Sequence, residues 1–378
     1  MTKEFITVLI PTYNRAALLL ETLDSVFSQT RQPDEIIILN DGCTDHTLKV
    51  LQELGDRIRV LSFKNQGKSG ALNSGLQEVG GGLVWIVDDD DLMEPAALET
   101  LENLLIENPD AGFSYGRHGR FSLNRGQIKK FDTGHWCTCR PEEFFVSTMD
   151  DMFAHQPGML VRKSLYDKVG PFETSLARSL DYEMLLRLAR VANVASTDDV
   201  VFWQRVHDGE RGAGKTAISS SERDAKWIEN DQIIFRKLYA AIELKEYIPS
   251  SLNLAGVAAE RYALLRRGVI MARKKLWELA VSDFRRARDV SNAPLTNEER
   301  QILRSAFAGK YGCDEIVHDQ ALMSLMMELK DGSRSGFEFT SVLGEGLLWR
   351  VRYAFFSGQF ISSFKLCACM LRLKSEKN

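Results

Sequence analysis

Residues 83–91 read Leu83-Val84-Trp85-Ile86-Val87-Asp88-Asp89-Asp90-Asp91, an apolar run followed by four aspartates. The apolar run predicts a buried strand. The aspartates therefore follow at its carboxyl end, where open α/β sheets usually bind ligands. Adjacent like charges repel one another, and hard cations such as Mg²⁺ or Mn²⁺ relieve that repulsion through oxygen ligands. Taken alone, the stretch fits a metal site and a solvated acidic loop equally well.

Strand and helix patterns alternate around this stretch. Such alternation predicts a parallel, doubly wound sheet with helices between the strands. Strands are expected at 5–10, 35–39, 58–63, 83–87 and 111–115, and helices at 16–29, 47–54, 71–79 and 95–108. The turn-rich stretch 117–215 adds a strand at 158–161, a helix at 181–190 and a strand at 200–205.

Helical patterns dominate after residue 220, so we predict two domains, 1–220 and an all-helical 221–378. The small and aromatic residues of one helix pair have tetratricopeptide spacing, although an ordinary helical bundle is slightly favoured. Residues 349–374 mix basic and apolar side chains, which is typical of helices that lie on a membrane surface, but burial within the bundle is favoured. The residues with repeat spacing are Gly268, Ala280, Phe284 and Ala287.

Composition narrows the class of protein. The chain has 378 residues, 44% of them hydrophobic and 26% charged, as is ordinary for a globular protein. A net charge of −4 gives no basic surplus for nucleic acid. No signal peptide or bilayer-spanning stretch is apparent, and six cysteines in so long a chain suggest free thiols in the cytoplasm. Zinc at Cys137 and Cys139 is disfavoured, because further ligands are lacking nearby.

Polar residues follow each of the first three predicted strands. Tyr13 can stack on a planar base, and Asp41 can accept a hydrogen bond from a base or ribose. Lys68 stands among small residues at a helix start, which suits a phosphate. The spacing there is not that of a Walker loop, and no Gly-x-Gly-x-x-Gly follows the first strand. A plain turn with a helix cap is the alternative at each of these positions.

With these segments in order, the chain resembles family 2 glycosyltransferases of the GT-A fold. The resemblance covers about the first third of the chain, continues more weakly to about residue 210, and does not extend to the helical tail. It implies an α/β fold with a mostly parallel, doubly wound sheet. The segments that carry it are Ile10-Pro11-Thr12-Tyr13-Asn14-Arg15, Asn40-Asp41-Gly42-Cys43-Thr44-Asp45, residues 65–75 and Val87-Asp88-Asp89-Asp90-Asp91.

The resemblance assigns roles to individual residues. Asp88 and Asp90 match the family's D-x-D motif, with Asp90 as the expected direct metal ligand, and Asp89 stands where the family often has a small residue. The implied ligands of Mn²⁺ or Mg²⁺ are Asp90, Asp91 and His207. The implied nucleotide-sugar residues are Pro11, Thr12, Tyr13, Arg15, Asp41, Lys68, Asp88 and Asp89.

The acceptor half is implied by later segments. Val169-Gly170-Pro171-Phe172 resembles the family's Gly-Gly-Phe, and Leu180-Asp181-Tyr182-Glu183 resembles its Glu-Asp-x-Asp, with leucine replacing the first acid. This implies Asp181 as the general base, since a sugar hydroxyl needs a carboxylate to take its proton. The residues alone also allow a helix cap, with Glu183 and Arg187 forming an i,i+4 pair. A loop at 209–215, with Arg211 and Lys215, is expected either to cover the donor or to be a linker.

We therefore expect an inverting, metal-dependent glycosyltransferase that uses a nucleotide-diphosphate sugar. Its acceptor would be a saccharide or lipid-linked saccharide in bacterial surface polysaccharide or glycoconjugate synthesis, in the cytoplasm or at the inner face of the membrane. The C-terminal helices would supply any membrane contact or homo-oligomer. The alternative is a non-catalytic sugar-nucleotide-binding or scaffold protein that acts through its helical tail.

Overall fold

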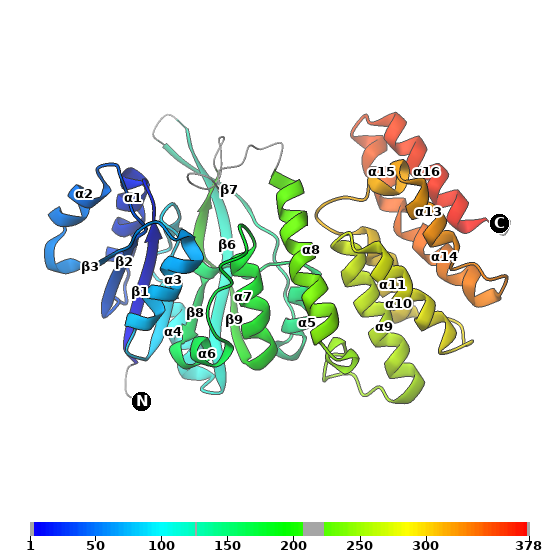
Figure 1. The fold of residues 1–378 in the computed structure, drawn as a ribbon, viewed down its shortest axis with the longest axis horizontal. Coiled ribbons are helices and arrows are strands. Elements are labelled where there is room, and N and C mark those ends of the chain that lie inside the picture. Colours follow the sequence, from blue (N-terminus) through cyan, green and yellow to red (C-terminus); the bar gives the residue numbers. More distant parts are fainter. Residues whose placement is uncertain (1–3, 125–126, 207–222, 376–378) are drawn as a thin grey trace. The chain divides into compact units, whose positions relative to one another are not determined.

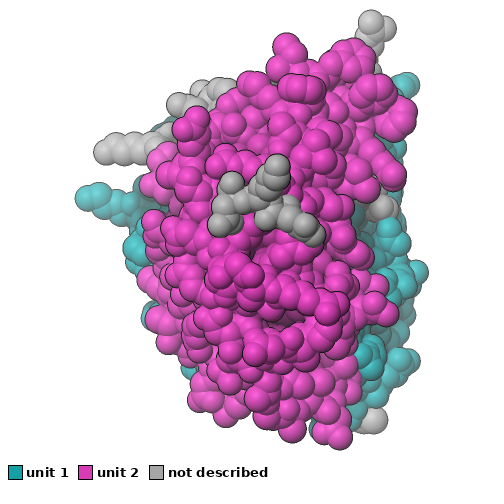
Figure 2. All heavy atoms as spheres, turned by 90° about the vertical axis from the view of Figure 1, so that its right-hand side faces the viewer, with its two compact units in different colours: residues 1–148, 152–223 teal, residues 149–151, 224–378 magenta. Residues whose placement is uncertain are grey.

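A computed structural model describes residues 4–124, 127–206 and 223–375 of the chain. The chain forms two compact units, one of residues 1–148 and 152–223 and the other of residues 149–151 and 224–378 (Figures 1 and 2). The domain boundary that was expected near residue 220 lies outside the described residues.

The first unit is built on one sheet with the strand order β3-β2-β1-β4-β8-β6-β9-β5, and β7 pairs with β6 (Figure 1). The central strands are apolar and buried, as expected for a sheet covered on both faces. The strands are β1 (Ile6–Thr12), β2 (Glu35–Asn40), β3 (Arg59–Ser62), β4 (Leu83–Ile86), β5 (Leu92–Met93), β6 (Ala111–Asn124), β7 (Gln127–Thr133), β8 (Met159–Arg162) and β9 (Asn193–Arg205).

Helices cover both faces of this sheet, and alternate residues of each strand point to opposite faces. In β1, Leu9 packs toward α3, α5, α6 and α7, whereas Val8 and Ile10 pack toward α1, α2 and α4. The expected α/β architecture, with helices wound on both faces, is confirmed. The helices of this unit are α1 (Ala16–Phe27), α2 (Thr47–Glu53), α3 (Gly67–Glu78), α4 (Ala97–Glu107), α5 (Phe144–Asp150), α6 (Lys163–Val169) and α7 (Leu180–Val191).

The two halves of the sheet differ in strand direction. Strands β3, β2, β1 and β4 are parallel throughout, as predicted. In the other half, β8 is antiparallel to both β4 and β6, while β6 and β9 run parallel over a long register. The indole N–H of Trp85 in β4 donates to the carbonyl of Pro157 at 2.8 Å, which ties the two halves together.

Gly82 fixes the point at which β4 enters the sheet. Its φ is +77°, and a Cβ there would lie 2.1 Å from the carbonyl oxygen of Phe5. Only glycine tolerates both this backbone conformation and this close approach. The register of β4, and with it the position of the aspartates that follow, therefore depends on this residue.

The second unit is helical in its described residues. α9 and α10 pack against each other, and a Cβ on Gly268 would lie 2.6 Å from the ring of Phe284. This contact involves two of the residues with tetratricopeptide spacing, and the repeat assignment itself stays a prediction. The helices are α8 (Arg223–Ala241), α9 (Gly256–Arg273), α10 (Trp277–Asp289), α11 (Asn297–Arg304), α12 (Glu315–His318), α13 (Gln320–Met327), α14 (Arg334–Gly346), α15 (Leu348–Phe356) and α16 (Phe360–Lys374).

The last two helices, α15 and α16, form a hairpin that exposes large apolar side chains. Phe356 is 84% exposed and Phe364 is 77% exposed. The favoured expectation that this segment is buried in a bundle is therefore wrong for these residues. Among the helices of the described residues, none combines the length and apolarity needed to cross a bilayer.

Candidate functional site

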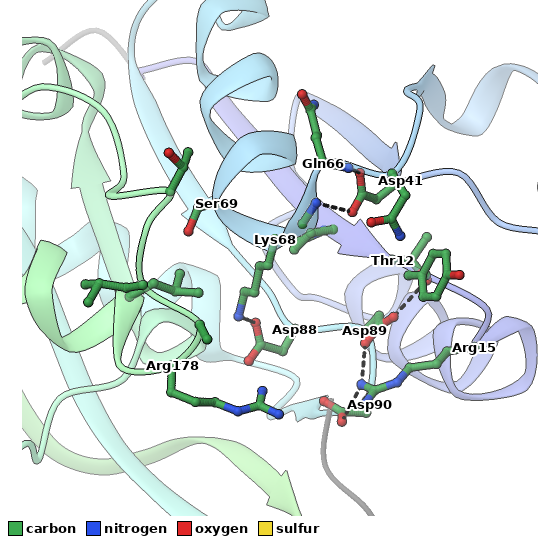
Figure 3. A pocket seen from close by; sticks show the side chains of 18 of the residues that line it. Thr12, Arg15, Asp41, Gln66, Lys68, Ser69, Asp88, Asp89, Asp90 and Arg178 are labelled. Carbon is green, nitrogen blue, oxygen red and sulfur yellow. Dashed lines mark hydrogen bonds and ion pairs between the residues drawn. The ribbon is translucent and has the colours of Figure 1, made fainter. Parts of the chain in front are cut away.

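A pocket of about 860 Å³ lies at the carboxyl ends of β1, β2 and β4 (Figure 3). Its walls come from the loops after these strands, the start of α3, the segment 174–178 and the end of β9. Carboxyl ends of parallel strands meet at one edge of a sheet, so residues far apart in sequence converge here. The lining residues that were predicted from sequence are Pro11, Thr12, Tyr13, Arg15, Asp41, Lys68, Asp88, Asp89, Asp90 and Asp91.

Asp41 holds the start of α3 from the neighbouring loop. Its carboxylate oxygens accept the backbone N–H groups of Gln66 at 2.8 Å and Gly67 at 2.9 Å. The first N–H groups of a helix lack partners within it, so this carboxylate caps the helix and complements its dipole. Burial raises the pKa of Asp41, although the two amides act in the opposite direction. Each oxygen keeps a second lone pair, so the side chain can still accept from a ligand.

The loops after β1, β2 and β3 are held together at close range. Gly42 has a φ of +79°, and a Cβ there would lie 2.9 Å from the amide nitrogen of Asn65. The side chain of Asn14 does not cap the following helix but accepts the N–H of Thr44 at 2.7 Å. Through these contacts, the loops that form the pocket wall are held against one another.

Asp89 is the buried member of the aspartate cluster. It accepts a hydrogen bond from the Thr12 hydroxyl at 2.7 Å and from Nη1 of Arg15 at 2.9 Å. The same nitrogen lies 2.9 Å from a carboxylate oxygen of Asp90. Burial raises the pKa of Asp89 to about 6, against the opposing charge of Arg15. Asp89 therefore ties the end of β1 to the end of β4, a role that its place in the sequence did not indicate.

The other three aspartates converge on one point. Asp88, Asp90 and Asp91 each offer a carboxylate oxygen, and these oxygens lie within 4.8 Å of one another. Asp91 is buried, accepts the backbone N–H of Arg205 at 3.0 Å, and has its pKa raised well above the usual range by burial and by its acidic neighbours. An oxygen-only donor set of this kind suits a hard divalent cation.

Basic side chains surround the aspartates. Lys68 lies 2.5 Å from Asp88, and Arg178 points toward Asp88 and Asp90 (Figure 3). Burial lowers the pKa of Lys68, but Asp88 and Asp181 more than offset it and the net shift is upward. The pocket thus holds acids and bases in close alternation, which suits a polyphosphate together with its counter-cation.

The start of α3 also contacts the loop at 170–173. The side chain of Asn73 donates to the carbonyl of Phe172 at 3.0 Å and accepts its N–H at 2.7 Å. The hydroxyl of Ser69 donates to the carbonyl of Glu173 at 3.2 Å. The expected donor side and the expected acceptor side of the pocket are therefore joined through one helix.

Arg187 holds the same loop from α7. Its guanidinium donates to the carbonyls of Val169 at 2.7 Å, Gly170 at 3.1 Å and Pro171 at 2.9 Å. It also forms the expected i,i+4 pair with Glu183, with an N–O distance of 2.7 Å. Arg187 thus positions the segment that resembles the family's Gly-Gly-Phe.

Asp181 lies in the first turn of α7 and is half-buried. It is not among the residues that line the pocket, although Leu180 beside it is. Its charge acts on Lys68, which does line the pocket, and one of its oxygens accepts the N–H of Tyr182 at 2.9 Å. Asp181 therefore lies next to a residue of the pocket wall and within electrostatic reach of Lys68.

The remaining expectations fall elsewhere. His207, Arg211 and Lys215 lie outside the described residues. Two pocket arginines, Arg178 and Arg205, had no predicted role. Arg205 ends β9, and its Nε donates to the carbonyl of Asp90 at 2.8 Å. Arg205 could have been noticed in the sequence as a basic residue at the end of a predicted strand. Arg178 lies in an irregular segment, where no sequence pattern marks it.

Comparison with known proteins agrees with this geometry. The model of glycosyl transferase family 2 matches residues 7–170. An uncharacterized glycosyltransferase of Rickettsia typhi is 29% identical over 231 residues, covering 59% of this chain and 70% of the relative. The glycosyltransferase GlyA of Streptococcus pneumoniae is 36% identical over 126 residues, 32% of this chain and 18% of GlyA. The hyaluronan synthase of Pasteurella multocida is 26% identical over 216 residues, 56% of this chain and 22% of the synthase.

Several of these relatives are longer proteins. An uncharacterized glycosyltransferase of Rickettsia felis is matched over 37% of its length. Among solved structures, S. aureus TarS 1–349 in complex with UDP-GlcNAc has a TM-score of 0.49 and 13% identity, covering 93% of this chain and 92% of that chain. The segment that matches the family model contains all of β1 except Ile6, strands β2 to β4 and all four aspartates. Residues 7–170 of this chain are thus a glycosyltransferase domain of family 2.

Proposed function

We propose that this chain is an inverting, metal-dependent glycosyltransferase that moves a sugar from a nucleotide-diphosphate sugar to an acceptor hydroxyl. The observation that carries the proposal is one pocket in which Asp41, Lys68 and the aspartates 88–91 meet at the edge of the sheet. The family match over residues 7–170 supports sugar transfer as the reaction. The named hyaluronan synthase among the relatives supports polysaccharide or glycoconjugate synthesis as the context.

The nucleotide would bind beside the loops after β1 and β2. Tyr13 is half-buried at the pocket wall and offers a ring for a base, while Asp41 is held rigidly by its two amides. Preformed acceptors of this kind lower the ordering cost of binding. Nη1 of Arg205 is buried without a partner among the described residues, which favours an anionic group nearby.

The donor set fits a divalent cation. Asp88, Asp90 and Asp91 bring three oxygens within 4.8 Å, and the burial of Asp91 beside two further carboxylates favours a bound cation. A bound Mn²⁺ or Mg²⁺ would stabilise the negative charge that develops on the departing nucleoside diphosphate. Lys68 and Arg178 lie where they would neutralise further charge on that group. We propose His207 as an additional ligand of this cation.

The acceptor would be activated by Asp181. This carboxylate would take the proton from the attacking hydroxyl, as a general base must when the nucleophile has a high pKa. Attack from the face opposite the leaving diphosphate gives inversion at the sugar carbon. The loop held by Arg187 would form the acceptor side, with a saccharide or lipid-linked saccharide as substrate.

The test is Asp181→Asn, assayed with a panel of UDP-, GDP- and dTDP-sugars in the presence of Mn²⁺. We expect turnover to fall by at least about a hundredfold, the usual scale of general-base catalysis, while nucleotide affinity by calorimetry stays unchanged. Asp167→Asn is the matched control, because this exposed carboxylate lies on α6, away from the pocket. Normal turnover in Asp181→Asn would show that another group is the base. Failure of the unaltered chain to transfer or hydrolyse any donor would instead favour a binding or scaffold role.

A further inference from the structure

The hairpin of α15 and α16 carries a compact aromatic surface. Its exposed large apolar side chains within residues 353–364 range from 53% exposed at Phe355 to 84% at Phe356. Exposed apolar groups on a soluble monomer are usually scattered, so a contiguous group marks an interaction surface. We call this group the hairpin tip, and it consists of Tyr353, Phe355, Phe356, Phe360, Ile361 and Phe364.

Hydrogen bonds and ring contacts hold the hairpin tip together. The N–H of Gln359 donates to the carbonyl of Ala354 at 2.8 Å, and the hydroxyl of Ser363 donates to the carbonyl of Val351 at 3.0 Å. The ring of Phe355 packs edge-on against Phe356 and Phe360, with centroid distances of 5.6 and 5.5 Å. The opposite side of the hairpin is packed, with Ala354, Ser363, Leu366 and Leu373 buried. The exposed rings are thus presented by a closed turn.

The charge around the hairpin tip is of one sign. Residues 346–375 contain five basic side chains and no acidic one, in a chain whose net charge is −4. Arg352 and Lys365 flank the tip and are exposed, and neither forms an ion pair with another described residue. The basic residues of this segment are Arg350, Arg352, Lys365, Arg372 and Lys374.

Aromatic and basic side chains together suit the surface of a bilayer. Rings prefer the boundary between headgroups and acyl chains, and Lys and Arg extend their charged ends to the headgroups. Interfacial helices combine these two faces, and anionic lipids strengthen their binding. α16 has 15 residues, which is short of the length of about 20 that a membrane-spanning helix requires. The hairpin therefore suits lying in the interface.

We propose that the hairpin of α15 and α16 docks the chain on an anionic lipid bilayer, with the hairpin tip at the depth of the headgroups. A second copy of the chain would fit the hairpin tip less well. A two-fold interface would bring the same patch against itself, and the like charges of both copies would face each other with no acid in the segment to pair them. An anionic membrane supplies the missing opposite charge.

The test is flotation of the full chain with vesicles of phosphatidylcholine alone or mixed with phosphatidylglycerol. We expect binding to the mixed vesicles only. Phe356→Ser combined with Phe364→Ser should remove most of the binding, and Arg352→Glu combined with Lys365→Glu should weaken it by at least about twentyfold, given roughly fivefold for each basic residue. Because all four side chains are exposed, melting temperatures should stay unchanged in both variants.

The control variants change exposed side chains outside the hairpin. Val257→Ser alters an apolar side chain that is 54% exposed, and Lys49→Glu with Arg334→Glu reverses two exposed charges outside the hairpin. Both should bind as the unaltered chain does. A Phe356→Trp variant adds a depth probe, whose emission brominated acyl chains should quench.

Three results would overturn the proposal. One is equal binding to neutral and mixed vesicles, and another is full binding by the serine variant. The third is a dimer in light scattering that the serine variant abolishes, combined with no vesicle binding by the unaltered chain. That last result would make the hairpin an interface between copies.

Discussion

The pocket and the hairpin tip gather charge in opposite ways. In the pocket, four aspartates lie among Lys68, Arg15 and two further arginines, and most of these groups are at least half-buried and paired. On the hairpin, basic side chains stand among exposed rings without any acid in the segment. The pocket arrangement fixes the positions of its side chains, whereas the hairpin leaves the charges of Arg352 and Lys365 exposed to a binding partner.

This difference between the pocket and the hairpin tip shows that the surroundings of a charged side chain determine its role. Arg15 and Arg352 are the same residue type, yet Arg15 shares one nitrogen between Asp89 and Asp90 while Arg352 is exposed to solvent. A buried, paired charge is costly to remove because its partner is left uncompensated. An exposed charge acts at longer range and is screened by salt. Substitutions in the two regions should therefore have effects of different size and kind.

The largest effect is expected at Asp90. Asp90→Asn removes one of three converging carboxylates, so turnover should fall by at least about a hundredfold through loss of charge stabilisation by the cation. Steady-state assays across a Mn²⁺ titration measure this. Asp56→Asn, an exposed carboxylate outside the pocket, is the control. If the two variants behaved alike, the aspartate cluster would not be the metal site.

The next effect is expected at Arg187. Arg187→Ala leaves three loop carbonyls and Glu183 without their donor. A hydrogen bond to a charged group contributes about 1.5–3 kcal/mol, and water can replace part of the lost bonding at this partly exposed site, so a net loss of about 2–3 kcal/mol is expected. The melting temperature should fall and the KM for the acceptor should rise. Arg187→Lys should recover less than half, because lysine lacks the planar fork. Lys168→Ala, an exposed neighbour on α6, should change neither quantity.

A smaller effect is expected at Arg15. Arg15→Ala removes one partner of buried Asp89 while the Thr12 hydrogen bond remains, so a loss of about 1–2 kcal/mol is expected. Adding Asp89→Asn in the same chain should cost less than the sum of the two single changes. A double-mutant cycle on melting temperatures measures this coupling. Strict additivity would mean that the contact contributes nothing.

The smallest effect is expected at the hairpin tip. Phe356→Ser alters a side chain that is 84% exposed, so stability should change by no more than about 0.5 kcal/mol. Turnover on a water-soluble acceptor should also stay unchanged, since the residue is outside the pocket. Thermal melting and the transfer assay check both points. A loss of turnover without a loss of stability would show that the hairpin tip affects the pocket, so the two regions would not be independent.

The sequence predicted the parallel half of the sheet well, because β1, β2 and β4 are short, largely apolar runs closed by polar residues. It did not predict the full length of β6, which continues to Asn124 through the polar stretch after Tyr115. Pairing with β7 and β9 holds that stretch extended. Tertiary pairing of this kind leaves no periodic signal within the strand itself.

Contacts from other loops explain the remaining differences. The predicted helix at 71–79 begins instead at Gly67, because Asp41 accepts the first amides from across the sheet edge. Asp89 could not be separated from its neighbours by sequence, since only the fold turns its side chain toward Thr12. Arg178 stands in an irregular segment between two recognisable motifs, so its place at the pocket became visible only in three dimensions.

The bond between Asp91 and Arg205 joins residues that are 114 positions apart. Contacts between distant residues form slowly, and a chain emerging from the ribosome can make them only after the later partner has been synthesised. All four aspartates leave the ribosome long before β9, which pairs with β5, the strand directly after them. The nascent chain thus carries the acidic cluster through the synthesis of 114 further residues before the end of β9, which positions Asp91, has been made. The pocket is therefore among the last parts of this unit to be completed.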